Sequence, residues 1–202
     1  MKTRIVVMWL QLLLAALPLG AAFGQGADVP TAVSPTMLKQ VDHEAETTLL
    51  RLYRQSPKAQ ALVGRSFGVL VVPALHADGG ILGVAYGRGV LIDAVGDRSY
   101  YNFIASPPGS VLGLDGKALI LFFTAYEALR AFEAAPGWVE GENGSIQILD
   151  DTFMASQRST AIQPIAGFIL AEEGLAGGLS LKGSLFIKVP IYLCAADAAS
   201  CR

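Results

Sequence analysis

An apolar stretch broken by glycines, residues 67–92, constrains the fold of this chain more than any other segment. It opens with FGVLVV, and a run so rich in β-branched residues, ended by Pro73, is typical of a buried strand. Asp78-Gly79-Gly80 is typical of a turn, because glycine adopts positive φ without a Cβ clash. We expect two short strands to follow, over residues 81–86 and 88–93, with bends at the glycines at positions 83, 87 and 89.

A similar glycine pattern returns near the C-terminus, over residues 167–186. When the two stretches are aligned, several glycines coincide, and Arg88 meets Lys182. The pattern predicts two similar strand-bend-strand units around one core. Strongly bent antiparallel strands favour a closed or nearly closed barrel, or a sandwich.

Two helices are predicted before the first strand. Over residues 36–55, apolar or small residues recur at spacings of three and four: Met37, Val41, Ala45, Thr48, Leu49 and Leu52. Ser56-Pro57 then predicts the start of a second helix, because proline is favoured at the first helical position. A central helix is predicted to follow Thr124, whose hydroxyl can form a capping box with Glu127, and to stop at Pro136-Gly137.

The remaining pattern predicts strands over residues 99–104, 111–114, 118–123 and 145–150, a loop over 151–160, and the last strands within 162–189. The fold class that follows is α+β. We expect a bent, mainly antiparallel, glycine-rich β barrel or sandwich, with two N-terminal helices and one central helix.

Residues 1–24 have the features of a secretory signal peptide: basic Lys2 and Arg4, an apolar run, and small residues before Gln25. An uncleaved anchor is the alternative, because residues 5–23 carry no charge. Gln11, Pro18 and the small-residue exit favour cleavage. The expected organisation is a signal at 1–24, a linker at 25–35, one domain at 36–191 and a tail at 192–202. The expected location is periplasmic or secreted, peripheral to a membrane.

The net charge and the cysteines narrow the classes of function that the chain can have. The net charge is −2, and the predicted signal holds two cations and no acidic residue, so the mature chain is more acidic still. Nucleic acid is therefore not an expected partner, because its binding needs a basic field. Cys194 and Cys201 are the only cysteines, and export permits a disulfide between them. Histidines and cysteines are too scattered to predict a metal site, and we expect no cofactor.

The only histidine with a candidate chemical role is His76, which has Asp78 close by in the sequence. A catalytic triad would also need a nucleophile on a strand-to-helix turn, and the one Gly-x-Ser-x-Gly match, residues 64–68, lies instead between the second predicted helix and the first predicted strand. His43 falls on the charged face of the first predicted helix. We therefore do not expect an enzyme, and a hydrolase using His76 is kept as an alternative.

Several pieces of the chain resemble the SYLF domain family, which includes exported bacterial proteins and eukaryotic actin-patch adaptors. In order they are VLVVP at 69–73, GGILGVAYGRGVL at 79–91, SYYN at 99–102, LFFT at 121–124, AGFI at 166–169 and EGLAGGLSLKGS at 173–184. The resemblance extends from about residue 38 to residue 189 and implies phospholipid binding without enzymatic activity. The chain departs from the family at the prolines of SPPG, residues 106–109, and by a one-residue shift near Trp138.

The predicted function is non-catalytic phospholipid binding at the bacterial envelope, through a basic, amphipathic N-terminal helical surface. The candidate headgroup contacts are Arg51, Arg54, Lys58 and Arg65, each worth ~1 kcal/mol near an anionic membrane. The candidate apolar contacts are Met37, Val41, Leu49 and Leu52, and Arg88 and Lys182 are additions from the glycine units. The expected partner is an anionic phospholipid or a membrane surface, and no protein partner is identified.

Three alternatives stay open. The basic residues could be ordinary solvated charges, and the apolar helix face could close the β core. In the second case only the basic residues, or a cavity, would remain to bind lipid. The chain could also be a structural or protein-interaction module of the envelope, using a sheet edge or the first helix.

Overall fold

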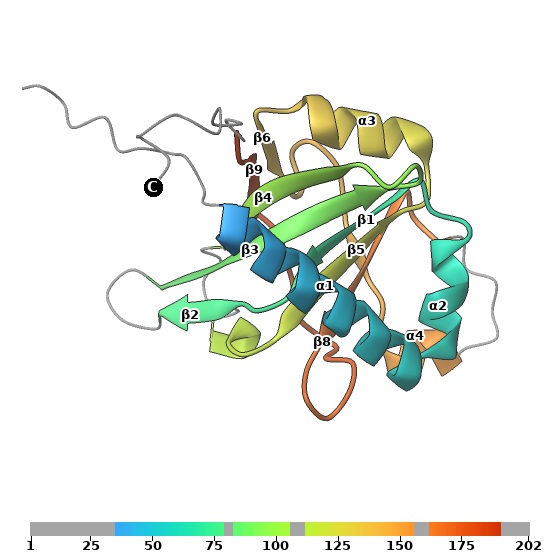
Figure 1. The fold of residues 1–202 in the computed structure, drawn as a ribbon. Helices are drawn as coiled ribbons and strands as arrows, with labels where there is room; N and C mark the ends of the chain where they lie inside the picture. Colours follow the sequence, from blue (N-terminus) through green and yellow to red (C-terminus); the bar gives the residue numbers. More distant parts are fainter. Residues whose placement is uncertain (1–34, 79–82, 106–111, 156–161, 191–202) are drawn as a thin grey trace, which may run out of the picture. The chain divides into compact units, whose positions relative to one another are not determined.

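The computed structural model describes residues 35–78, 83–105, 112–155 and 162–190 (Figure 1). The predicted signal, the linker up to residue 34 and both tail cysteines lie outside these residues. The helical elements are α1 (Pro35–Gln55), α2 (Pro57–Val63), the 3-10 turn η1 (Leu112–Leu114), α3 (Tyr126–Ala134) and α4 (Asp151–Ala155). The strands are β1 (Gly68–Val72), β2 (His76–Asp78), β3 (Val84–Asp93), β4 (Arg98–Ala105), β5 (Ala118–Phe123), β6 (Gly137–Val139), β7 (Gln147–Ile148), β8 (Ile165–Leu170) and β9 (Leu185–Lys188).

The strands of the described residues form one nine-stranded sheet in the order β6-β9-β4-β3-β1-β5-β8-β7, with β2 paired to β3 beside this path. Neighbouring strands are antiparallel except β7 and β8, which are parallel. The prediction of an α+β fold on a bent, mainly antiparallel sheet is thus confirmed. The sheet curls into a half-barrel (Figure 1). Strands β6 and β7 stand at the two ends of the strand order.

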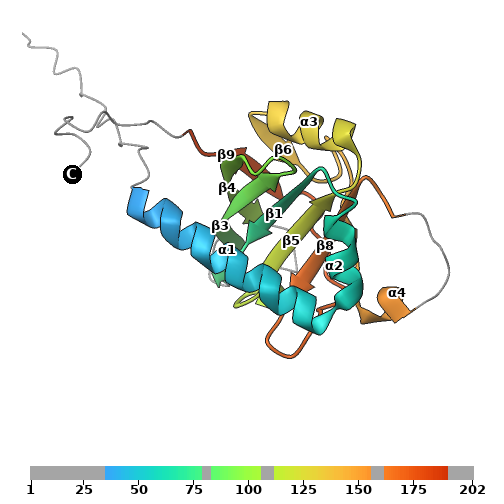
Figure 2. The same cartoon turned by 45° about the vertical axis from the view of Figure 1, so that its right-hand side comes forward.

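Strand β1 lies in the middle of the sheet and all five of its residues are buried. Its side chains alternate between two cores, as side chains of successive strand residues must. Val69 and Val71 join a core with α1 and α2, whereas Leu70 and Val72 join a core with α3. The helices therefore cover opposite faces of the sheet (Figure 2). We call these the α1 face and the α3 face.

Helices α1 and α2 confirm the two N-terminal helices. Ser56 caps α2, its Oγ accepting a hydrogen bond from the N–H of Ala59, and Pro57 occupies the first turn. The α1 residues that enter the core are Val41, Ala45, Thr48 and Leu52. None of the helices in the described part of the chain is both long enough and apolar enough to span a bilayer.

The prediction of two separate strands over residues 81–86 and 88–93 is wrong, because β3 is one strand that pairs with β4 along nearly its whole length. Gly87 and Gly89 do not break it. A Cβ at Gly89 would lie 2.6 Å from the carbonyl oxygen of Val71, and one at Gly87 would lie 2.7 Å from that of Ala74. These glycines let the chain that leaves β1 cross close over β3, which the spacing along one strand could not reveal.

Other local predictions also fail. Residues 112–114 form η1 rather than a strand, and residues 151–155 form α4 rather than a loop. The hydroxyl of Thr124 donates to the carbonyl of Gln163 instead of capping α3. The two glycine stretches are not similar units either: residues 67–92 hold β1, β2 and most of β3, which pair with one another, whereas residues 167–186 hold the end of β8 and the start of β9, which are not neighbours in the sheet.

Candidate functional site: a groove beside the N-terminal half of α1

Register places four side chains of β3 and β4 together on the α1 face. Val90 and Tyr100 are cross-strand partners in the core with α1, so Arg88 with Asn102, and Tyr86 with Ile104, must point to the same face further along the strands. Tyr86 is 50% exposed and Ile104 is 37% exposed. Helix α1 therefore covers the Val90–Tyr100 pair and leaves the next two pairs open.

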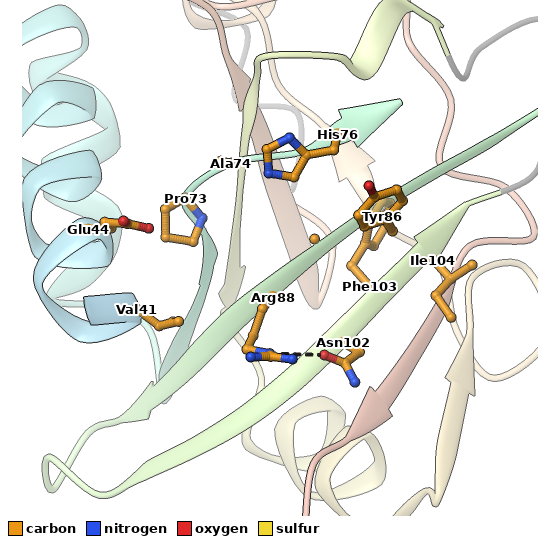
Figure 3. A pocket seen from close by; sticks show the side chains of 11 residues that line it. Val41, Glu44, Pro73, Ala74, His76, Tyr86, Arg88, Asn102, Phe103 and Ile104 are labelled. Carbon is orange, nitrogen blue, oxygen red and sulfur yellow. Dashed lines mark hydrogen bonds between the residues drawn. The ribbon is translucent and has the colours of Figure 1, made fainter. Parts of the chain in front are cut away.

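A groove of about 390 Å³ lies over these open pairs (Figure 3). Its walls come from α1, from the segment that joins β1 to β2, and from β3 and β4. The lining residues are Val41, Glu44, Pro73, Ala74, His76, Tyr86, Gly87, Arg88, Asn102, Phe103 and Ile104. Its volume falls within the roughly 300–1,000 Å³ range of small-molecule sites.

The groove exists because the chain leaves the sheet at Pro73. Proline has no N–H for the ladder, so β1 ends at Val72 and pairing with β3 resumes only at His76. Between these points β3 is unpaired on one side at Gly87, Arg88 and Gly89. Pro73 and Ala74 then form a groove wall opposite the strand.

Arg88 is the cation of the groove, and its contacts are neutral. Its Nε donates to Asn102 Oδ1 at 3.4 Å, and its Nη1 donates to the sulfur of Met37. Glu44 lies across the groove on α1, where its Oε1 accepts from Gln40 Nε2 at 2.8 Å. Among the described residues, neither Arg88 nor Glu44 joins an ion pair. Both charges are thus open to a ligand.

The apolar surface next to Arg88 extends past β4. Ile104 faces Leu185 of β9, and Leu185 in turn faces Val139 of β6. Ile187, opposite Asn102, lies on the same side. Leu185, Val139 and Ile187 are half-buried. We call Tyr86, Ile104, Leu185, Ile187 and Val139 the open strip, since α1 packs over β1 and β3 instead.

The groove continues on the other side of Glu44. A second hollow of about 390 Å³ shares Glu44, Pro73 and Ala74 with it and is also lined by His43, Thr47 and Thr48. The Thr47 hydroxyl donates to the carbonyl of His43 at 3.0 Å, so its oxygen is left as an acceptor. Glu44 therefore stands where the two hollows meet.

A polar network anchors α1 to β4 beside the groove. The Tyr100 hydroxyl donates to Asp42 at 3.0 Å, and Arg98 pairs with Asp42 at 3.0 Å and with Glu46 at 2.9 Å. Burial, and then the hydrogen bond to Asp42, raise the pKa of Tyr100 to about 12. The hydrogen bonds to Glu46 and Asp42 raise the pKa of Arg98. This network fixes the helix that forms one groove wall.

A further hollow of about 490 Å³ lies between the end of α3 and strands β4 and β9. Arg98, Glu133 and Lys188 are its charged lining residues. Arg98 is already paired with two carboxylates, and none of the large apolar side chains of the lining is exposed. The groove at Arg88 is therefore the stronger candidate site.

The predicted apolar contacts on α1 are mostly not accessible. Val41 is 7% exposed and Leu52 is fully buried, while Leu49 packs at the edge of the same core. The burial of Val41 and Leu52 contradicts the expectation that they enter lipid, because the sheet already uses that helix face, whereas contact of the half-buried Leu49 with lipid stays a prediction. Met37 differs: it is 46% exposed and contacts Arg88 at the groove.

The predicted basic residues do not gather at the groove. From Val41 to Arg54 the helix rises about 20 Å, so Arg51 and Arg54 lie toward the opposite end of α1. Lys58 and Arg65 follow on and after α2, and both are exposed. Arg51 is half-buried, with a buried Nε that has no hydrogen-bond partner among the described residues. Lys182 is exposed in the loop before β9, near Gly141.

Of the sequence candidates, the structure thus brings together Arg88, Met37 and Val41. Sequence reasoning missed Glu44, Tyr86, Asn102 and Ile104. The signal that could have found three of them was alternation: Tyr86 and Ile104 flank Arg88 and Asn102 at every second position of two predicted strands. Their meeting also required the register between the strands.

His76 lines the groove but shows no catalytic partner there. It is exposed on β2, and its ring lies 5.7 Å from that of Tyr86. No serine or cysteine lines the described part of the groove. The described residues also contain no cluster of three or more His, Cys, Asp or Glu that could hold a metal.

No protein-family model matches the chain, and no curated protein matches it either. The resemblance to the SYLF domain therefore stays a prediction from the residues.

Proposed function

We propose that the protein is a non-catalytic phospholipid binder of the bacterial envelope, and that the lipid phosphate binds Arg88 in the groove. The observation that carries the proposal is an uncompensated guanidinium set among exposed apolar side chains. Tyr86 and Ile104 line the groove with Arg88, and Met37 contacts it. A phosphate next to an apolar chain is the chemistry that such a surface fits, because arginine binds phosphate in a bidentate manner.

In this mode of binding the lipid headgroup enters the groove, and helix α1 does not insert into the membrane. Because Val41 and Leu52 are in the core, α1 serves as a wall and not as the inserting element. The open strip supplies the apolar area beside the headgroup, and adsorption scales with such area. The groove requires a phosphate but not a net negative lipid, so an anionic phospholipid is one candidate among several. Peripheral attachment of an exported protein agrees with this role.

Co-sedimentation of the purified protein with phospholipid vesicles tests the proposal. We expect binding to weaken about tenfold or more in Arg88→Met, which keeps the length of the side chain but removes the charge-assisted hydrogen bonds. Arg130→Met is the matched control, because Arg130 is an exposed arginine of α3, on the opposite face of the sheet. Unchanged binding in Arg88→Met would overturn the groove.

The double variant Arg51→Ala with Arg54→Ala tests the hypothesis, drawn from the sequence, that the basic residues of α1 and α2 bind the lipid headgroup. If only this variant loses binding, the basic end of α1 and α2 is the headgroup surface and the groove is not. If neither variant binds less, or the wild-type protein binds no vesicle, a protein-interaction role of the envelope domain is favoured instead. Hydrolysis of a vesicle lipid that is lost in His76→Ala would favour the hydrolase alternative.

A further inference from the structure

The groove carries two opposite charges on its two sides. Arg88 extends from β3 and Glu44 projects from α1, with Pro73 on the wall near Glu44 (Figure 3). Arg88 is hydrogen-bonded to the neutral side chain of Asn102, and Glu44 to that of Gln40. Neither charge therefore has an oppositely charged partner among the described residues. A headgroup with only a negative charge would use one of the two.

The neutral polar side chains follow the same division, with a hydrogen-bond donor near Arg88 and an acceptor near Glu44. On the strand side, Asn102 uses its Oδ1 to accept from Arg88, which leaves its amide nitrogen to donate. On the helix side, the Thr47 hydroxyl donates its hydrogen bond to the carbonyl of His43, which leaves the hydroxyl oxygen free to accept. One side therefore offers donors, and the other offers acceptors beside a carboxylate.

We propose that the groove selects a zwitterionic phospholipid with a primary amine, of the phosphatidylethanolamine type. This inference rests on the proposed function and names its ligand. The phosphate accepts hydrogen bonds from Arg88 and Asn102, and the ammonium donates to Glu44 and reaches toward Thr47 in the adjoining hollow. An ammonium has three donors, which this acceptor side can use, whereas a quaternary amine has none.

The choice between headgroups follows from this arrangement. Phosphatidylglycerol presents the same phosphate but no cation, so Glu44 would gain no partner and would repel the anion. Phosphatidylcholine presents a cation that cannot donate, and its methyl groups would meet the polar oxygens of Glu44 and Thr47. The groove is thus predicted to prefer the primary amine over both.

The test measures co-sedimentation of the purified protein with three sets of phosphatidylcholine vesicles: unmodified, or carrying equal fractions of phosphatidylethanolamine or phosphatidylglycerol. We expect the apparent affinity to be about three- to tenfold higher with phosphatidylethanolamine. Glu44→Gln should abolish this preference and leave or improve binding to phosphatidylglycerol. Glu127→Gln, an exposed carboxylate on α3, is the matched control and should change nothing.

The outcomes separate the two proposals. Binding that depends on Arg88 but is equal for the three vesicles, or that favours phosphatidylglycerol or phosphatidylcholine, overturns the amine selectivity and keeps the phosphate site. A preference that survives Glu44→Gln also overturns it, because the carboxylate is then not the amine contact. Failure of the Arg88→Met test overturns both. Glu44 is exposed, so its substitution is expected to leave folding intact, which thermal unfolding checks.

Discussion

Tyr100 and Tyr101 are neighbours in β4, but their side chains enter the two opposite cores of the molecule. The Tyr100 hydroxyl, on the α1 face, donates to Asp42. The Tyr101 hydroxyl, on the α3 face, is buried without a hydrogen-bond partner among the described residues. The α1 side holds mainly aliphatic side chains and one ring pair, Phe122 with Phe168, with a polar anchor at its edge, whereas the α3 side holds a larger cluster of packed rings.

This difference predicts how each side responds to perturbation. A core of rings should be most sensitive to lost volume, because cavities in close-packed interiors are costly. A helix anchored by charges should respond to pH and salt as well. The same anchor fixes the helix wall of the groove, so the polar side of the molecule is also the side that we propose binds lipid.

Removal of the ring at Phe132 should have the largest effect. Phe132 is fully buried on α3, with four aromatic rings near it: Phe123 at 4.9 Å, Tyr101 at 5.0 Å, Trp138 at 5.4 Å and Phe186 at 5.6 Å between centroids. We expect Phe132→Ala to lower the free energy of unfolding by about 3–5 kcal/mol. For Leu52→Ala, on the buried face of α1, we expect about 2–5 kcal/mol. Urea unfolding measures both.

Phe132→Leu provides a milder variant in case the alanine variant does not fold. It keeps part of the volume, and we expect a smaller loss, about 1–3 kcal/mol. A consistently larger loss at Leu52 would show that the α1 side, rather than the ring cluster, is the more tightly packed half of the core.

Alkaline pH should weaken the α1 side. The pKa of Tyr100 is raised to about 12 by burial and by its bond to Asp42, whereas an unfolded tyrosine has a pKa near 10. Below about pH 10 both states keep the proton, and the full stabilisation is present. As the pH rises through this window, the unfolded chain loses the proton first, so stability falls by up to ~2–3 kcal/mol.

Tyr100→Phe removes this titration and is the measurement that checks it. Unfolding in urea at several pH values between about 9 and 12 should give a shallower fall for the variant than for the wild type. Equal slopes would show that the pKa of Tyr100 does not differ between the folded and unfolded states. Tyr101 adds a separate component of the same sign, because burial also raises its pKa.

How much of this could be predicted from the sequence depended on whether the signal was local. Helix α1 and strands β1 and β5 were predicted because their periodicity and their proline or glycine boundaries lie within one segment. The continuity of β3 could not be predicted in that way. Gly87 and Gly89 leave room for the backbone carbonyls of Ala74 and Val71, which belong to a different part of the chain.

The candidate site was harder to predict for the same reason. The apolar face of α1 is visible in the sequence, but whether it meets lipid or a sheet depends on a sheet formed far along the chain. The four basic residues at the other end of the helices are prominent because they are close in sequence. Arg88 and Glu44 face one groove only because β1 ends at Pro73 and α1 lies across the sheet.

At neutral pH the two tyrosines should respond in opposite ways to loss of the hydroxyl. Tyr100→Phe is expected to lower the free energy of unfolding by about 1 kcal/mol, because a hydrogen bond to a carboxylate is lost while Asp42 keeps Arg98. Tyr101→Phe should be neutral or slightly stabilising, because it removes a buried donor without a partner. A matched loss in both variants would show that the Tyr101 hydroxyl is hydrogen-bonded in solution.

The smallest effect is expected from the exposed half of the anchor. Glu46 is 56% exposed and Arg98 is 34% exposed, so their pair is solvated and screened. Glu46→Gln should lower the free energy of unfolding by only about 0.2–1 kcal/mol, and most of this difference should disappear in ~1 M salt, where the Debye length is about 3 Å.

Arg98→Met should cost more than Glu46→Gln, because it leaves the better-covered Asp42, at 21% exposure, without its cation. Thermal unfolding of both variants at low and high salt measures the difference, with Glu127→Gln as the control for a surface carboxylate that forms no ion pair among the described residues. If the two variants lose the same amount and salt leaves both unchanged, α1 is held by its apolar face alone. The contrast between a polar side and an aromatic side would then reduce to the hydroxyl of Tyr100.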